Sequence, residues 1–168
     1  MKNEMCVAHR KGTFMTKEEF AELVLESTDS LYRVSKGILK NDEDCEDAVW
    51  EAVSIAFAKL DTLRQPEFAK TWLIRILIHE CYRVLRERKH YASADAELLG
   101  EEEKSSMAYF DLYEALHSME EKYRLPLVMF YLEGYSIREI AQILDSTEGT
   151  VKSWLGRGRK MLRKRMEA

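Results

Sequence analysis

The stretch that decides the fold is Gly134-Tyr-Ser-Ile-Arg-Glu-Ile-Ala-Gln-Ile-Leu-Asp-Ser-Thr-Glu-Gly-Thr-Val-Lys-Ser-Trp-Leu155. Ser136 and Glu139 have the spacing of a capping box, in which a hydroxyl and a carboxylate satisfy free amides at a helix start. Apolar residues then recur at helical spacing for about two turns, at Ile137, Ile140, Ala141 and Leu144. Because Asp145-Ser146 interrupts this pattern, we expect a short helix that ends in a tight turn.

A second helix is predicted after the turn. Thr147 can cap it, and Glu148 in its first turn suits the positive end of the helix dipole. Its apolar face continues through Val151, Trp154 or Leu155, and Leu162. Two short helices joined by a tight turn are typical of a helix-turn-helix, whose second helix enters the major groove and reaches base edges.

The predicted second helix continues into a basic run. Every ionised residue between Val151 and Arg165 is Lys or Arg, and such a run can neutralise phosphates on both sides of a groove. The plain alternative is a solvated helix end whose cations complement the helix dipole. The caps, the turn and the charge together favour DNA binding. The residues expected to contact duplex DNA are Thr147, Glu148, Gly149, Thr150, Lys152, Ser153, Arg157, Arg159 and Lys160.

The net charge of −4 conceals a segregated pattern of charge. Acidic residues dominate residues 41–61 and 92–121, whereas basic residues are concentrated in residues 70–89 and 151–165. The cationic segments suggest a nucleic-acid partner and the anionic segments a protein partner. Only two prolines, seven glycines and few β-branched alternations predict an all-α protein, and 168 residues suffice for one domain or two small ones.

The cysteines and the hydropathy indicate a cytoplasmic, soluble protein. Cys6, Cys45 and Cys81 are an odd and scattered set, which fits a reducing compartment better than a disulfide framework. Cys6 and His9 have a metal-like spacing, but no second pair completes a site, so neither a metal nor another cofactor is expected. No apolar run approaches the roughly 20 residues of a membrane span, and no signal-peptide core is present.

Three helices are predicted in the first half, after a loose tail over residues 1–15. The first runs from Thr16 to about Lys40, and a break near Ser27 to Ser30 is left open. The second runs from Asn41 to Leu60. A loop over residues 61–69 contains Arg64 and Pro66 and separates it from a third helix, residues 70 to about 88.

The second and third helices each carry a candidate binding face. On the second, the outward residues Asp44, Asp47 and Glu51 surround Trp50. An indole there is more often a core or rim residue than an interface anchor, and both interpretations stay open. On the third, a basic and aromatic face could hold phosphates and unstacked bases. Its residues are Lys70, Trp72, Arg75, His79, Tyr82, Arg83 and Arg86. The alternative is a solvated basic face with Trp72 in the core.

The second half begins after a flexible acidic linker over residues 92–106. One helix is expected around Tyr109 to Met119, and another from about Arg124 to Glu133, because Pro126 is tolerable only in a first turn. Gly134 is a natural C-terminal cap. The core against which the helix-turn-helix packs is expected to be Leu127, Val128, Phe130, Tyr131 and Leu132. The expected fold is therefore all-α, with two small helical domains over residues 16–91 and 107–168.

The motifs, taken in order, resemble the extracytoplasmic-function (group IV) sigma factors of bacterial RNA polymerase, in the sigma-70 family. The resemblance covers residues 16 to 165 and rests on separated motif sets in the right order. These are Leu31-Tyr-Arg-Val34, Asp42-Glu-Asp-Cys-Glu-Asp-Ala-Val49, Leu60-Asp61, Phe68-Ala-Lys-Thr-Trp-Leu-Ile-Arg-Ile76, Tyr131-Leu-Glu-Gly-Tyr-Ser-Ile-Arg-Glu-Ile-Ala-Gln-Ile-Leu144 and Glu148-Gly-Thr-Val-Lys-Ser153.

The resemblance implies a transcription initiation factor with several partners. The first domain would bind the β′ clamp coiled coil of core RNA polymerase through Asp44, Asp47, Trp50 and Glu51. It would also recognise the −10 element and its opened non-template strand, through Arg64 and the basic face of the third helix. The second domain would bind the β-flap and the double-stranded −35 element. A cognate anti-sigma factor, often membrane-anchored in this family, would regulate the chain, which would not itself insert into a membrane.

Four residues depart from the pattern that the resemblance implies. Trp50 stands where glutamine is common, Trp154 where arginine is common, and Gly156 and Gly158 where histidine and alanine are common. Two glycines cost about 1 kcal/mol each in a helix interior relative to alanine. A bent or less rigid recognition helix is therefore expected.

Two other classes of function remain to be weighed against a sigma factor. A stand-alone helix-turn-helix regulator with an N-terminal sensing or dimerisation domain is one alternative, but such a domain has no need of the basic face between Lys70 and Arg86. A nucleic-acid-modifying enzyme is the other. It is not expected, because no metal or nucleophile constellation has a recognisable spacing.

Overall fold

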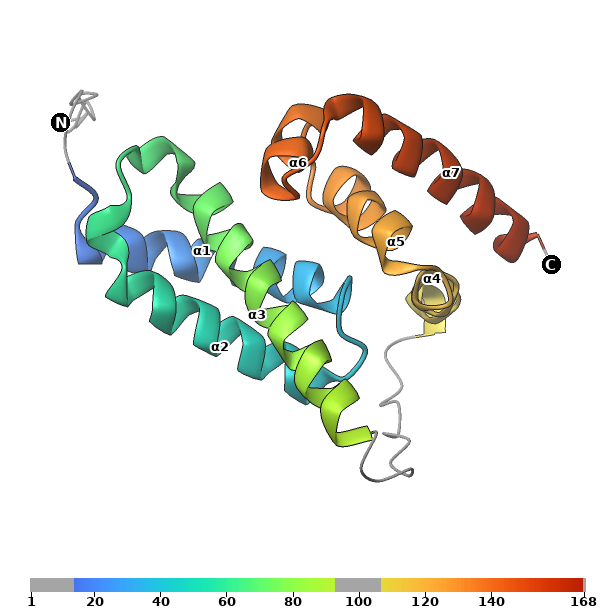
Figure 1. Cartoon of the computed structure of the whole chain (residues 1–168), viewed down its shortest axis with the longest axis horizontal. Helices are drawn as coiled ribbons and strands as arrows, with labels where there is room; N and C mark the ends of the chain where they lie inside the picture. Colours follow the sequence, from blue (N-terminus) through green and yellow to red (C-terminus); the bar gives the residue numbers. More distant parts are fainter. Residues whose placement is uncertain (1–13, 93–106, 168) are drawn as a thin grey trace, which may run out of the picture.

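The computed structural model describes residues 14–92 and 107–167, which form an all-α structure (Figure 1). The predicted fold class is confirmed: across these residues there are seven α-helices and no strand. Most of the predicted tail and linker, together with Cys6 and His9, lie outside the described residues. The elements are α1 (Lys17–Lys36), α2 (Asp42–Ala58), the short turns η1 (Leu60–Thr62) and η2 (Pro66–Phe68), α3 (Ala69–Ala92), α4 (Met107–His117), α5 (Glu121–Leu127), the π-helical turn η3 (Val128–Leu132), α6 (Ile137–Ile143) and α7 (Glu148–Met166).

Helix α1 begins at the predicted capping box and runs without a break. The Thr16 hydroxyl accepts from the Glu19 amide at 3.1 Å, and the Glu19 carboxylate accepts from the Thr16 amide at 2.8 Å. The break left open near Ser27 to Ser30 does not occur. Both serines are buried instead, and the Ser30 hydroxyl donates to Glu133 in the second half of the chain. Small polar residues there mark a packing surface rather than a helix end.

Helices α1, α2 and α3 pack around one another to form the first half of the molecule (Figure 1). The Asn41 side chain caps α2 by accepting from the Asp44 amide at 3.2 Å. The face of α2 turned inward is made of small residues, which let its backbone approach α3 closely. They are Cys45, Ala48, Ala52 and Ala56, and the facing α3 core residues are Leu73, Ile74, Leu77 and Cys81.

Helix α5 departs from the sequence prediction. It begins at Glu121 rather than near Arg124, so Pro126 lies inside the helix and not in its first turn. Proline has no amide to donate within a helix, and the wider π-helical turn η3 follows directly. Because this turn changes the helical spacing, Tyr131 and Leu132 are 54% and 41% exposed, and the prediction that they belong to the core is wrong.

The helix-turn-helix is confirmed in its local details. Gly134 has φ +70°, the left-handed conformation expected of a cap. The Ser136–Glu139 capping box forms at the start of α6. Asp145 takes φ 48° in the turn, and the Thr147 hydroxyl accepts from the Thr150 amide at 3.2 Å to cap α7. Each local signal in the sequence therefore produced the predicted backbone feature.

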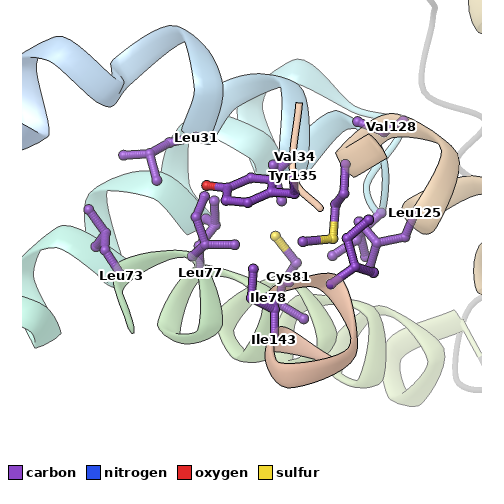
Figure 2. Close-up of a cluster of buried hydrophobic side chains, with 14 of the residues drawn as sticks. Leu31, Val34, Leu73, Leu77, Ile78, Cys81, Leu125, Val128, Tyr135 and Ile143 are labelled. Carbon is purple, nitrogen blue, oxygen red and sulfur yellow. The ribbon is translucent and has the colours of Figure 1, made fainter. Parts of the chain in front are cut away.

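The two halves share one buried apolar cluster. Figure 2 shows side chains from both halves meeting in it. Those from α1 and α3 are Leu31, Val34, Leu73, Leu77, Ile78 and Cys81, and those from α5, η3, α6 and the residue after Gly134 are Leu125, Val128, Ile143 and Tyr135. The second half therefore packs on the α1–α3 face of the first.

Helix α7 runs unbroken through both of its glycines, from Glu148 to Met166. Gly158 is buried, and a Cβ there would lie 3.0 Å from Leu127 Cδ1 and 3.3 Å from the Tyr123 carbonyl oxygen. A Cβ at Gly156 would meet nothing within 4 Å. The glycine at 158 thus lets α7 approach α5 closely, whereas the one at 156 has no such role.

We predict opposite effects for two matched substitutions in α7. Gly158→Ala should lower the free energy of unfolding by about 1–3 kcal/mol, because it overpacks the α5–α7 contact. Gly156→Ala should raise it by up to about 1 kcal/mol, because alanine favours a helix interior. Urea unfolding of the two variants and the wild type measures both. Equal effects of the two substitutions would contradict the packing role of Gly158.

The buried side chain of His117 should lower the free energy of unfolding in mild acid. Burial lowers its pKa to about 4, and the cations of Arg124, Lys36 and Lys40 act in the same direction. In an unfolded chain histidine titrates near 6.5. Because the folded state then binds fewer protons, stability should fall as the pH drops from about 6.5 to about 4, by at most about 3 kcal/mol. Urea unfolding at pH 7 and pH 5 should show this fall in the wild type and a smaller one in His117→Leu. An equal fall in both would rule out this role.

Candidate nucleic-acid interface

The outer face of α7 presents basic and small polar side chains. Val151 and Leu155 are buried and anchor α7, while Trp154 is half-buried. The opposite positions are exposed: Glu148, Gly149, Lys152, Ser153, Arg157, Arg159 and Lys160. Thr147 and Thr150 are held by a hydroxyl contact of 2.9 Å at the helix start. The predicted duplex-contacting residues therefore lie together on one helix, mostly on its outer face.

The cations of this face differ in what they contact. Arg159 donates from Nη1 to the Tyr131 hydroxyl at 3.0 Å, which ties it to η3. Within the described parts of the chain, Lys152, Arg157 and Lys160 form no ion pair. These three cations could therefore exchange water for phosphate without first breaking a salt bridge.

The basic face of α3 is only partly open. Arg75 donates from Nη2 to both carboxylate oxygens of Asp145 in the helix-turn-helix, at 3.0 and 3.1 Å. Lys70 Nζ lies 5.7 Å from the centroid of the Tyr135 ring, a cation–π contact. Two of the residues predicted to face single-stranded DNA thus contact the second half of the protein.

Other predicted residues of this face have local partners. Arg83 is bound at 2.7 Å by both Glu80 and Glu87, and these carboxylates raise its pKa. Trp72 is half-buried and meets Phe20 edge-on, with the ring centroids 6.1 Å apart. That placement favours the core alternative for this indole. The predicted residues with exposed side chains are Arg64, His79 and Arg86.

The acidic face of α2 is exposed and contains an aromatic residue. Trp50 is 72% exposed, so it does not belong to the core of the protein. Asp47 and Glu51 beside it are also exposed. Asp44 differs, because its carboxylate accepts from Arg88 Nε at 2.6 Å and its side chain is only 17% exposed. An exposed indole between carboxylates has the character of a protein-interface anchor.

Sequence reasoning missed the polar residues that join the two halves. Arg124 is buried and donates to backbone carbonyls of both halves, and Glu133 pairs with Arg33 and accepts from Ser30. The available signal was an arginine inside the apolar run Tyr123–Met129, because a buried charge requires partners. The Glu133 side chain gave no comparable local signal.

Across residues 14–92 and 107–167, no group of three or more His, Cys, Asp and Glu side chains could hold a metal ion. None of the helices in the same ranges combines the length and the apolar character that crossing a bilayer requires.

Comparison with known proteins matches both halves to one family. Residues 23–91 match Sigma-70 region 2, and residues 109–162 match Sigma-70, region 4. The chain is 28% identical to RNA polymerase sigma factor SigV of Bacillus subtilis, over 88% of this chain and 91% of SigV. It is 27% identical to ECF RNA polymerase sigma factor SigW of the same species, over 89% of this chain and 90% of SigW.

A solved structure shares the fold across both halves. It is that of the sigma factor RpoE in complex with the anti-sigma factor NepR from Bartonella quintana. The TM-score is 0.80 at 23% identity, and the match covers 90% of this chain and 98% of RpoE.

Proposed function

Because this chain belongs to the extracytoplasmic-function group of the sigma-70 family of RNA polymerase sigma factors, we propose that it binds bacterial core RNA polymerase and directs promoter-specific initiation. The observation that supports this most is the presence of both DNA-facing elements in one chain. The basic face of α3 lies within the residues that match region 2, and α7 lies within those that match region 4. A stand-alone regulator needs only the second.

We assign one role to each of three faces, which lie on α7, α3 and α2. The exposed α7 residues around Lys152, Ser153 and Arg157 bind the double-stranded −35 element, since a helix start with small polar residues can reach base edges. The α3 face and Arg64 bind the −10 element and its opened non-template strand. The acidic face of α2 binds the β′ clamp coiled coil, and the second half binds the β-flap. The protein acts in the cytoplasm by tethering and capture, with no catalysis or cofactor of its own.

We also propose that an anti-sigma factor controls the chain. The support is the shared fold with a sigma factor whose solved structure contains an anti-sigma factor. An inhibitor that covered the acidic face of α2 would compete directly with polymerase.

The proposed function is tested by mixing the purified chain with core polymerase from its own host. Comigration with core, followed by RNA synthesis from the DNA upstream of the chain's own coding region, is the expected result. Binding to duplex DNA without association with active core would overturn the proposal in favour of a stand-alone helix-turn-helix regulator.

Lys152 should contribute an electrostatic, salt-dependent part of the affinity for the −35 duplex. Lys152→Ala should weaken binding to the promoter duplex and reduce the slope of log affinity against log salt by about 1, because one phosphate contact is lost. Lys59→Ala is the matched control, since this lysine is exposed in the first half, away from α7. Fluorescence anisotropy across a salt series measures both variants. An unchanged slope for Lys152→Ala would remove this residue from the interface.

Trp50 is predicted to be an anchor of the polymerase contact. Trp50→Ala should weaken the complex with core by about 2 kcal/mol, or roughly 30-fold, as for buried aromatic anchors at other interfaces. Because the indole is exposed in the free chain, the stability of the protein should not change. Leu25→Ala, at a residue 76% exposed on α1, is the matched control. If both variants bind core equally well, the anchor role fails.

A further inference from the structure

Trp154 lies on α7 at the edge between the buried side of the helix and its outer face. Its side chain is half-buried and packs against the apolar core. Thr150, one turn before it, and Arg157, one turn after it, lie on the same edge. Both of these residues are assigned to duplex DNA. The indole of Trp154 therefore borders the face that is assigned to the −35 element.

The polar atom of this indole is open to solvent. Among the described residues, the buried side-chain polar atoms without a hydrogen-bond partner are His117 Nδ1 and the Tyr135 hydroxyl, so Trp154 Nε1 is not buried in this way. No atom of residues 14–92 or 107–167 accepts a hydrogen bond from Nε1. Tryptophan is enriched at interfaces because its apolar body packs while its N–H finds a partner. Trp154 thus presents a donor that packing holds in place.

The position of Trp154 along α7 matches the rim of a major groove. It follows the capping residue Thr147 by seven residues, which places it about 10 Å along the helix at a rise of 1.5 Å per residue. The major groove of B-DNA is about 8.5 Å deep. When the start of α7 reaches the base edges, the indole therefore lies near the height at which the phosphates border the groove.

A phosphate oxygen suits this donor. The indole N–H can donate a hydrogen bond but cannot accept one, and a hydrogen bond to an ionised acceptor is stronger than one between neutral groups. Because packing already restricts the ring, binding costs it less side-chain entropy than it costs the exposed Lys152 and Arg157. Contacts to phosphates fix the orientation of a protein on the duplex and do not themselves read the sequence.

We propose that the Trp154 N–H donates to a phosphate oxygen at the rim of the −35 major groove and so sets how α7 lies in that groove. The inference rests on the proposed role of α7 at the −35 element. The contact is uncharged, unlike those of Lys152 and Arg157. Because the salt dependence of binding comes from cations that displace counterions, this contact adds affinity without adding to the salt slope.

The first test removes the donor and then replaces it with a cation. Trp154→Phe keeps an aromatic ring against the core, and its affinity for a duplex carrying the promoter upstream of the chain's own coding region should fall about tenfold. Its slope of log affinity against log salt should not change. Trp154→Arg should steepen this slope by about 1, because a cation then lies beside the phosphate. Fluorescence anisotropy of the full-length chains across a salt series measures both.

Trp50→Phe is the matched control, because it makes the same change at an exposed residue of α2. This variant should bind the duplex as tightly as the wild type does. Urea unfolding of the Trp154 variants reports any loss of stability that accompanies the change in binding.

A scan with methylphosphonates separates a direct contact from a disturbed fold of α7. Each modified duplex replaces one phosphate, which removes its charge and weakens it as an acceptor. At the contacted phosphate, Trp154→Phe should cost little further affinity, whereas at every other position its cost should stay about tenfold. A disturbed fold would instead lower the affinity for all of the modified duplexes equally.

Wild-type affinity of Trp154→Phe would overturn the contact, and so would a loss that is the same at every modified phosphate. An unchanged salt slope in Trp154→Arg would overturn it as well. The proposed function is tested separately, through association with core polymerase. A chain that shows the predicted contact on the duplex but never binds core polymerase would overturn the proposed function, and the phosphate contact of Trp154 would stand.

Discussion

The Arg124 guanidinium is buried where the two halves of the chain meet, and it donates to backbone carbonyls of both. A buried cation needs its hydrogen bonds satisfied, so it fixes where the end of α1 lies relative to α4 and α5. The Arg33–Glu133 pair then fixes α1 against the residues before Gly134. These polar contacts favour a single register for the apolar cluster between the halves.

The same contacts explain which parts of the fold could be predicted from the sequence. The caps at Ser136 and Thr147 and the left-handed Gly134 involve neighbours within a few residues, so the helix-turn-helix was predicted correctly. Packing of the halves depends on pairs such as Ser30 and Glu133, which are 103 residues apart. No periodicity reports such a pair. The serines of α1 therefore looked like a possible break, although both are buried and Ser30 contacts the other half.

The candidate site was predictable to a similar degree. The basic character of α3 and α7 followed from composition, but which cations are open depends on their partners in space. Arg83 is held by carboxylates one turn away on either side, and Arg75 by a carboxylate from the other half. The exposed Trp50 contradicted the usual preference for burying an indole. A residue that breaks the pattern of its surface in this way is where a function is to be sought.

A fluorescence distance between the halves tests the central claim most directly. Labels would be placed by Glu22→Cys on α1 and Arg163→Cys on α7, both exposed, in a chain carrying Cys6→Ser, because Cys45 and Cys81 are buried. Energy transfer should be efficient in the free chain, and Arg33→Glu should reduce it, because like charges would then meet at the buried contact with Glu133. Unchanged transfer in Arg33→Glu would contradict the account.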